Sequence, residues 1–246
     1  MKTIVIIYLL LIHIFVGITI VKTDIISRFQ AKLGYEVTSD EITPHYYTML
    51  AFHKRVDKNI PEKSLVFIGD SITQGLAVIA VSPQSINYGI GQDTTVGVLK
   101  RMPLYRSILE SKAVVIAVGI NDLKRRSNAE IVKNYRSIVN LVPRNIPVLF
   151  SAVLPVDEVA SGKVGFNERI RKLNDSLSDI CKKSRRLYFL NISKFVVNSN
   201  GNLSADYHIG DGVHLNRLGN EIWIAELKEY IQVMARNNKG QQNSGL

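Results

Sequence analysis

Short runs of apolar residues alternate with amphipathic segments through most of the 246-residue chain. A run that is apolar at every position predicts a strand buried on both faces, as in a parallel sheet. The ranges with this pattern are 65–68, 114–118, 148–150 and 187–190, and a weaker strand is expected over 86–88. The pattern therefore predicts a parallel sheet whose strands are separated by helices.

Three further segments repeat apolar residues at the spacing of one helical face. A capping box of Ser127 and Glu130 opens the first, and Pro143 stops it. Right-handed crossovers put such helices on both faces of a parallel sheet, so we expect an α/β fold with its ligand site at the carboxyl ends of the strands. The three stripes are Ile131, Tyr135, Ile138, Val139 and Val142; Ile170, Leu173, Leu177 and Ile180; and Trp223, Leu227, Tyr230, Ile231 and Met234.

The amino-terminal segment 3–21 contains no charged residue and is long enough to span a bilayer as a helix. Because no Ala-x-Ala site follows it, an uncleaved anchor is favoured over a signal peptide. We expect the body on the exported side, periplasmic or extracellular, or secreted if the segment is cleaved. The predicted organisation is 1–23 anchor or signal, 24–62 lead-in, 63–235 the α/β domain, and 236–246 a polar tail.

The composition is that of a globular protein with a surplus of positive charge. The apolar share is 46% and the net charge is +10. Such a surplus favours an anionic membrane surface or an acidic polymer, or it serves solubility. No nucleic-acid motif accompanies it, and nothing in the pattern indicates an oligomeric state. We expect neither metal nor cofactor, because the histidines lack ligand spacing; they are His13, His45, His53, His208 and His214.

Unusual polar segments follow the predicted strands. Residues 69–75 (GDSITQG) come directly after the first strand, 87–94 (NYGIGQDT) after the second, and 119–122 (GIND) after the third. A fourth segment, 211–216 (DGVHLN), precedes the last helix. Each alone fits an ordinary turn or helix cap, but together they supply the groups that acyl transfer requires.

A serine hydroxyl becomes a good nucleophile only when a base takes its proton, and His214 is suited to that task for Ser71. Asp211, three residues before the histidine, is close enough in sequence to hold the imidazole in one tautomer. The oxyanion needs donors already in place. The candidates are the Asn121 side chain and backbone N–H groups at Ser71 and in the turn 89–93.

These four segments, in this order, resemble the SGNH hydrolases, also called the GDSL family, over about residues 63–234. The resemblance implies a flavodoxin-like three-layer sandwich with an open site. It also implies that Ser71 is the nucleophile, His214 the base, Asp211 its partner, and Asn121 an oxyanion donor beside the Ser71 N–H.

One position departs from the family pattern. Gln92 stands where the family usually has the glycine of the oxyanion hole. Its backbone N–H can still donate, but a non-glycine residue is strained if the turn requires a positive φ. Gly91 would be the donor instead if the turn is shifted by one residue. The third donor is therefore Gln92 or Gly91.

The predicted activity is hydrolysis of a carboxylic ester, an O-acyl group on a glycan or lipid, through an acyl-enzyme at Ser71. A lysophospholipase, a thioesterase or an acyltransferase would use the same triad. From another class, a catalytically inactive binding module tethered by residues 3–21 remains an alternative.

Two further features concern the surroundings of the triad. His208 either lines the pocket or lies in a surface loop. Lys124, Arg125 and Arg126 follow Asn121 and either favour an anionic substrate or form a solvated segment.

Overall fold

The computed structural model describes residues 5–13, 16 and 41–243. The chain divides into two units, Met1–Asp40 and Glu41–Leu246. No helix within the described ranges is long and apolar enough to cross a membrane. Part of the predicted anchor 3–21 lies outside those ranges, so the anchor and the exported location stay predictions.

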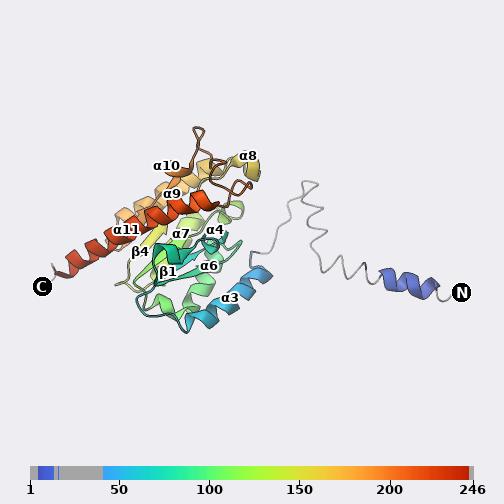
Figure 1. The fold of residues 1–246 in the computed structure, drawn as a ribbon, viewed down its shortest axis with the longest axis horizontal. Coiled ribbons are helices and arrows are strands. Elements are labelled where there is room, and N and C mark those ends of the chain that lie inside the picture. Colours follow the sequence, from blue (N-terminus) through green and yellow to red (C-terminus); the bar gives the residue numbers. More distant parts are fainter. Residues whose placement is uncertain (1–4, 14–15, 17–40, 244–246) are drawn as a thin grey trace. The chain divides into compact units, whose positions relative to one another are not determined.

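The second unit is built on a five-stranded parallel sheet in the order β2-β1-β3-β4-β5 (Figure 1). Four of these strands fall where apolar runs predicted them, and β2 falls where the weaker strand was expected. The strands are β1 (Leu65–Gly69), β2 (Ser85–Gly89), β3 (Ala113–Ala117), β4 (Val148–Ser151) and β5 (Leu187–Leu190).

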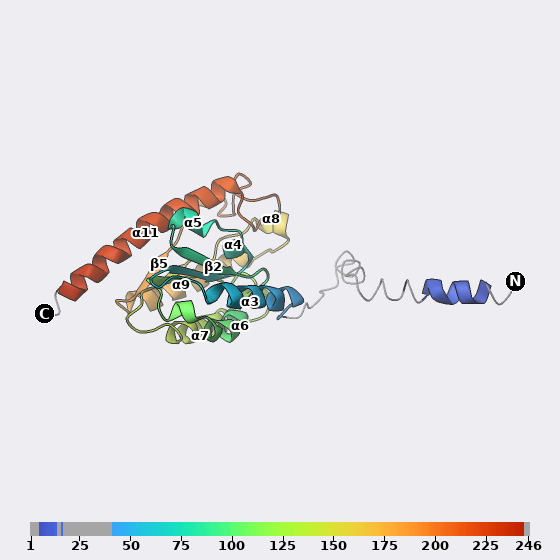
Figure 2. The ribbon, with the colours of Figure 1, turned by 60° about the horizontal axis from the view of Figure 1, so that its bottom comes forward.

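Helices cover both faces of the sheet, with α11 and α5 on one side and α6, α7 and α9 on the other (Figure 2). The predicted capping box opens α7. The helices are α3 (Pro44–Asp57), α4 (Ser71–Gln74), α5 (Val78–Val81), α6 (Thr95–Arg101), α7 (Asn128–Asn140), α8 (Glu158–Ser161), α9 (Phe166–Lys182), α10 (Ser193–Val196) and α11 (Arg217–Asn243), with short 3₁₀ turns η1 (Met102–Leu104), η2 (Arg106–Ile108) and η3 (Asp122–Lys124).

Alternate residues of β1, β3, β4 and β5 enter two different cores. Val66 and Ile68 of β1 pack in the core formed with α6, α7 and α9, whereas Leu65 and Phe67 pack in the core formed with α11. Trp223 is fully buried in the second core, as its place in the apolar stripe predicted. Burial on both faces explains why the strand sequences are continuously apolar.

Helix α3 packs against the α/β unit through a buried carboxylate. Asp57 accepts hydrogen bonds from the Tyr88 hydroxyl at 2.7 Å, the Ser107 hydroxyl at 2.5 Å and the Arg106 N–H at 2.7 Å. These contacts fix the helix to β2 and η2. The carboxyl half of the predicted lead-in 24–62 is thus part of the packed unit, while residues up to 40 lie outside the described ranges.

Candidate active site

Ser71 is the first residue of α4, immediately after β1. Asp70 caps this helix by accepting the Ile72 N–H at 3.0 Å, so the serine hydroxyl is not used as the cap. The strand passes very close to its neighbours here, because a Cβ at Gly69 would lie 2.1 Å from the Ala117 oxygen. The turn therefore presents Ser71 at the carboxyl end of the sheet.

Ser71, His214 and Asp211 form one hydrogen-bonded chain. The Ser71 Oγ lies 2.8 Å from the His214 Nε2, and the His214 Nδ1 lies 2.5 Å from the Asp211 Oδ2. The other Asp211 oxygen accepts the backbone N–H groups of Val213 and His214, both at 2.9 Å. The structure thus brings together the three residues that the sequence proposed as a triad.

The environment of Asp211 keeps it ionised. Burial raises the pKa of Asp211, but the hydrogen bonds from the His214 side chain and from two backbone N–H groups outweigh it and lower the pKa to about 2. Because the folded pKa lies below the ordinary value of 3.8, this stabilisation is present above that value and is lost as pH falls toward 2.

His208 holds the loop that carries Asp211 and His214. It is buried, and its Nδ1 accepts the N–H groups of Gly210 at 3.0 Å and Gly212 at 3.1 Å. Placing His208 in an exposed surface loop was therefore wrong. Its ring organises the backbone of the 208–214 loop, a role that only the folded loop reveals, since its partners are backbone groups.

The candidate oxyanion donors lie in loops that hydrogen bonds join: Gly91 is bonded to Gln74 of α4, and Asn121 to Asp93. Gly91 cannot supply the third donor, because its N–H already donates to the Gln74 side-chain oxygen at 2.5 Å. The backbone N–H groups of Ser71 and Gln92 donate to no other described residue. The Asn121 amide donates one hydrogen to the Asp93 oxygen at 3.0 Å, which orients the group and leaves its second hydrogen available.

Gln92 adopts the positive φ that is strained for a non-glycine residue, since its φ is 65°. We expect Gln92→Gly to stabilise the fold by about 0.5–1 kcal/mol, because the left-handed conformation costs a non-glycine residue about 1–2 kcal/mol and glycine entropy offsets part of the gain. Thermal unfolding should then shift upward by about 2–4 °C. The kcat should not change, because the backbone N–H is retained.

Gln92→Ala is the matched control, since it removes the same exposed side chain and keeps the strain. It should show no rise in melting temperature. A large fall in kcat for both variants would mean that the Gln92 side chain, and not its N–H, acts in the site.

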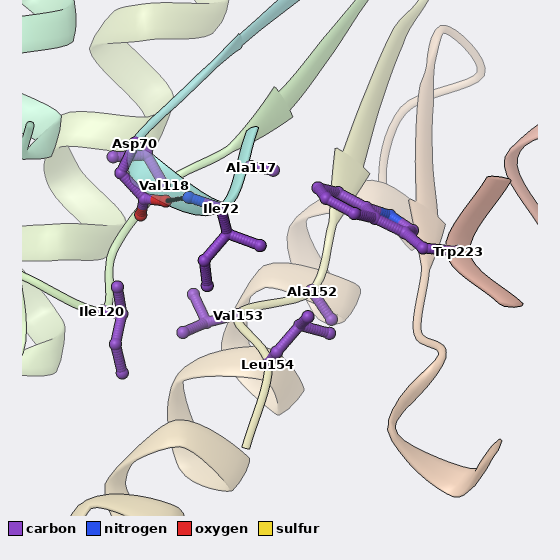
Figure 3. Close-up of a pocket in the computed structure, with 9 residues that line it drawn as sticks. All are labelled: Asp70, Ile72, Ala117, Val118, Ile120, Ala152, Val153, Leu154 and Trp223. Carbon is purple, nitrogen blue, oxygen red and sulfur yellow. Dashed lines mark hydrogen bonds between the residues drawn. The ribbon is translucent and has the colours of Figure 1, made fainter. Parts of the chain in front are cut away.

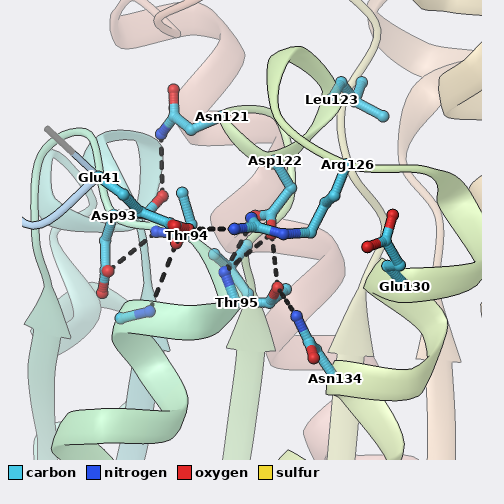
Figure 4. Close-up of polar contacts among 12 residues, drawn as sticks. Glu41, Asp93, Thr94, Thr95, Asn121, Asp122, Leu123, Arg126, Glu130 and Asn134 are labelled. Atoms are coloured by element: carbon cyan, nitrogen blue, oxygen red, sulfur yellow. Dashed lines mark hydrogen bonds and ion pairs between the residues drawn. The ribbon is translucent and has the colours of Figure 1, made fainter. Parts of the chain in front are cut away.

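A buried polar network supports the loops beneath the site (Figure 4). Asp93 pairs with Arg101 at 2.8 Å, and both side chains are fully buried. Asp122 accepts the Thr95 N–H and hydroxyl and pairs with Arg126. Each of these buried carboxylates therefore forms an ion pair with an arginine. The two ion pairs hold in place the turn that contains Asp93 and the turn that contains Asp122.

The predicted basic cluster is only partly available for a substrate. Arg126 is bound to Asp122 and to Glu41, so neither alternative, a substrate-binding group or a solvated residue, describes it. Lys124 and Arg125 are exposed. The Glu41 contact has no signature in the sequence, because the two partners are 85 positions apart.

No group of three His, Cys, Asp or Glu side chains in the described ranges is arranged to hold a metal ion.

A parallel α/β sandwich with a Ser71–His214–Asp211 chain at the carboxyl ends of its strands defines the SGNH class of hydrolase folds. Residues 67–222, well over half of the sequence, match the family described as GDSL-like lipase/acylhydrolase. The chain belongs to this family. A comparison with curated protein sequences gave no match.

Several solved structures share the fold. A GDSL-like lipase from Bacteroides thetaiotaomicron is 24% identical with a TM-score of 0.65, covering 74% of this chain and 97% of that one. A carbohydrate esterase family 3 protein from Talaromyces cellulolyticus is 15% identical with a TM-score of 0.55, covering 70% and 99%. The catalytic domain of peptidoglycan O-acetyltransferase A from Streptococcus pneumoniae is 16% identical with a TM-score of 0.55, covering 71% and 96%.

Proposed function

We propose that this protein hydrolyses carboxylic esters with a short acyl group, such as an acetyl group on a glycan hydroxyl, through an acyl-enzyme at Ser71. The observation that carries the proposal is the uninterrupted chain of hydrogen bonds from Ser71 through His214 to Asp211. A general base in contact with the nucleophile is the arrangement that acyl transfer needs.

In the first half-reaction the Ser71 Oγ attacks the ester carbonyl carbon while its proton passes to the His214 Nε2. The oxyanion is stabilised by the N–H groups of Ser71 and Gln92 and the free hydrogen of Asn121. His214 then protonates the departing alcohol as the C–O bond breaks. Asp211 stays ionised throughout, because its pKa is about 2, and stabilises the imidazolium.

In the second half-reaction water gives its proton to the His214 Nε2 and attacks the acyl carbon. The C–O bond to Ser71 breaks, His214 returns the proton to the Oγ, and the carboxylic acid leaves. Asp211 and His214 each expose 40% of the side chain, so water and a bulky alcohol group can both reach the triad.

A small apolar cavity lined by the two chain neighbours of Ser71, Asp70 and Ile72, supports the short acyl group (Figure 3). Its volume is about 20 Å³, room for a group the size of one water molecule or methyl. Two of the residues that line it are sequence neighbours of site residues: Ile72 follows Ser71, and Ile120 precedes Asn121. The remaining lining residues are Asp70, Ala117, Val118, Ala152, Val153, Leu154 and Trp223.

The test is a series of p-nitrophenyl esters with two, eight and sixteen carbons, together with labelling by a fluorophosphonate. We expect the two-carbon ester to have the highest kcat/KM, because the cavity lined by Asp70 and Ile72 has room for a methyl-sized group and not for a longer chain. Mass spectrometry should place the label on Ser71. A maximum at sixteen carbons would favour a lipase or lysophospholipase, and no turnover or labelling would favour a binding module.

Acyl transfer to an alcohol is the second candidate, since the fold is shared with the Streptococcus pneumoniae O-acetyltransferase domain. The same acyl-enzyme is consumed by water in one case and by a sugar hydroxyl in the other. Adding an oligosaccharide acceptor to the p-nitrophenyl acetate assay separates them, because only a transferase would form the acetylated sugar in preference to acetate.

A further inference from the structure

Helix α8 packs directly against the loop of the triad. The Asp157 N–H donates to the Gly212 oxygen at 2.8 Å, and a Cβ at Gly212 would lie 2.8 Å from the Asp157 oxygen and 3.0 Å from the Ser161 nitrogen. Gly212 adopts φ 73°, which lets the two backbones approach. Residues 157–163 therefore lie beside Asp211, at the edge of the site.

Lys163 follows this helix and lies near the triad carboxylate. Its backbone N–H donates to the Glu158 oxygen at 3.0 Å, so the lysine is fixed to the end of α8. Burial and the charge of Lys124 lower the pKa of Lys163, whereas the Asp211 charge raises it. Lys163 is thus within electrostatic reach of both Asp211 and Lys124.

Lys124 is presented by a second loop that is equally fixed. It lies in η3, three residues after Asn121. The Arg169 guanidinium of α9 donates to the Leu123 oxygen at 2.5 Å and to the Arg126 oxygen at 2.9 Å. This clamp holds the loop on both sides of Lys124, so the place of Lys124 three residues after Asn121, at the same end of the sheet as the triad, is fixed by the fold.

Neither lysine is neutralised in the described part of the chain, where no ion pair joins Lys124 or Lys163 to a carboxylate. The acidic side chains at the start of α8 contact groups other than the two lysines, and the Asp157 Oδ2 also lies 3.8 Å from the His208 Nε2. Asp157 accepts the Val159 N–H at 3.0 Å, and Glu158 accepts the Asn167 N–H at 2.8 Å. Two cations that form no ion pair create a positive potential that an anion would relieve, although the Asp211 charge offsets part of it at Lys163.

We propose that Lys124 and Lys163 together form an anion-binding site at the edge of the triad, which selects substrates carrying an acidic group on the alcohol half of the ester. This inference rests on the proposed esterase function. The small cavity beside Ser71 favours a short acyl group, so the substrate class is an O-acetylated acidic glycan and not a phospholipid.

The test compares two acetyl esters that differ only in charge, a mono-O-acetyl methyl galactoside and the corresponding mono-O-acetyl methyl galacturonoside. In the double variant Lys124→Gln, Lys163→Gln we expect kcat/KM for the acidic ester to fall about three- to tenfold, the effect of losing two solvent-accessible charge pairs. The change should appear mainly in KM. The neutral ester should be unaffected, and the difference should shrink at 1 M salt, where screening acts over about 3 Å.

Lys112→Gln is the matched control, because this exposed lysine precedes β3 and lies at the opposite end of the sheet. It should leave the charge preference intact. A double Lys→Arg variant should also retain the preference, which separates charge from local folding.

Equal losses on both esters, or none on either, would overturn the anion site while leaving the esterase proposal in place. Faster cleavage of an anionic lysophosphatidylglycerol than of either sugar ester would overturn the glycan class. Failure of the wild-type protein to cleave p-nitrophenyl acetate would instead overturn the proposed function itself, so the two failures are distinguishable.

Discussion

Ser71→Ala is expected to remove nearly all ester hydrolysis, with kcat falling by roughly 10⁴- to 10⁶-fold, the scale seen when a serine nucleophile is deleted. The reason is that the Oγ is the atom that forms the acyl-enzyme. Its only hydrogen bond to another described residue is to the His214 Nε2, so its loss leaves no buried group unpaired. The measurement is steady-state hydrolysis of p-nitrophenyl acetate, with thermal unfolding as the check on the fold.

The matched control for this variant is Ser176→Ala on α9, a serine whose hydroxyl donates to the Lys172 oxygen of the preceding turn and, within the described part of the chain, to no other group. Both variants should unfold at the wild-type temperature, and only Ser71→Ala should lose activity and fluorophosphonate labelling. Turnover that persists unchanged in Ser71→Ala would show that another group is the nucleophile.

The sheet was predictable because burial on both faces imposes a simple pattern. A strand such as 114–118 must be apolar at every position when α7 and α11 cover its two faces. The continuous apolar run is therefore visible in the sequence itself. The helical stripes of α7, α9 and α11 were predictable for the same reason. The spacing of Tyr46, Leu50 and Phe52 is also compatible with a helix lying against the domain, and in α3 Tyr46 is buried and Leu50 packs against the core while Phe52 is exposed. The polar contacts of Asp57 add to this attachment.

The candidate site was predictable where chemistry restricts the residue type. Ser71, Asn121, Asp211 and His214 lie in short segments placed after strands or before a helix, and the structure brings Ser71, His214 and Asp211 into contact. The supporting contacts were not predictable. His208 and Arg169 act through hydrogen bonds to backbone groups, which leave no mark on the sequence of their partners.

The sequence also does not predict which basic residues near the site are available to a substrate. Lys124, Arg125 and Arg126 are equivalent in sequence, yet Arg126 is engaged by Asp122 and by Glu41, far along the chain. Lys163 had no sequence signal, because its nearness to the triad depends on the contact between Asp157 and Gly212. Long-range packing therefore decides which cations face a substrate.

Asp211→Asn is expected to lower kcat by about 10⁴-fold while leaving the fold intact. The oxygen of the introduced amide can still accept the backbone N–H groups of Val213 and His214, which Asp211 Oδ1 accepts in the wild type. The amide NH₂ would then face the His214 Nδ1, which has to become an acceptor. The ring proton moves to Nε2, where it blocks transfer of the Ser71 proton. Hydrolysis of p-nitrophenyl acetate measures the loss.

Asp206→Asn is the matched control, since this exposed carboxylate lies in the same loop region and accepts only the Ser204 hydroxyl among the described residues. It should keep wild-type turnover.

The two variants also differ in acid stability. The stabilisation from the ionised Asp211 is lost only as pH falls from 3.8 toward 2, so Asp211→Asn should reduce the loss of stability that the wild type shows over that interval. Turnover in Asp211→Asn close to that of Asp206→Asn would show that His214 does not depend on Asp211 for its tautomer, and the triad would then reduce to a Ser71–His214 dyad.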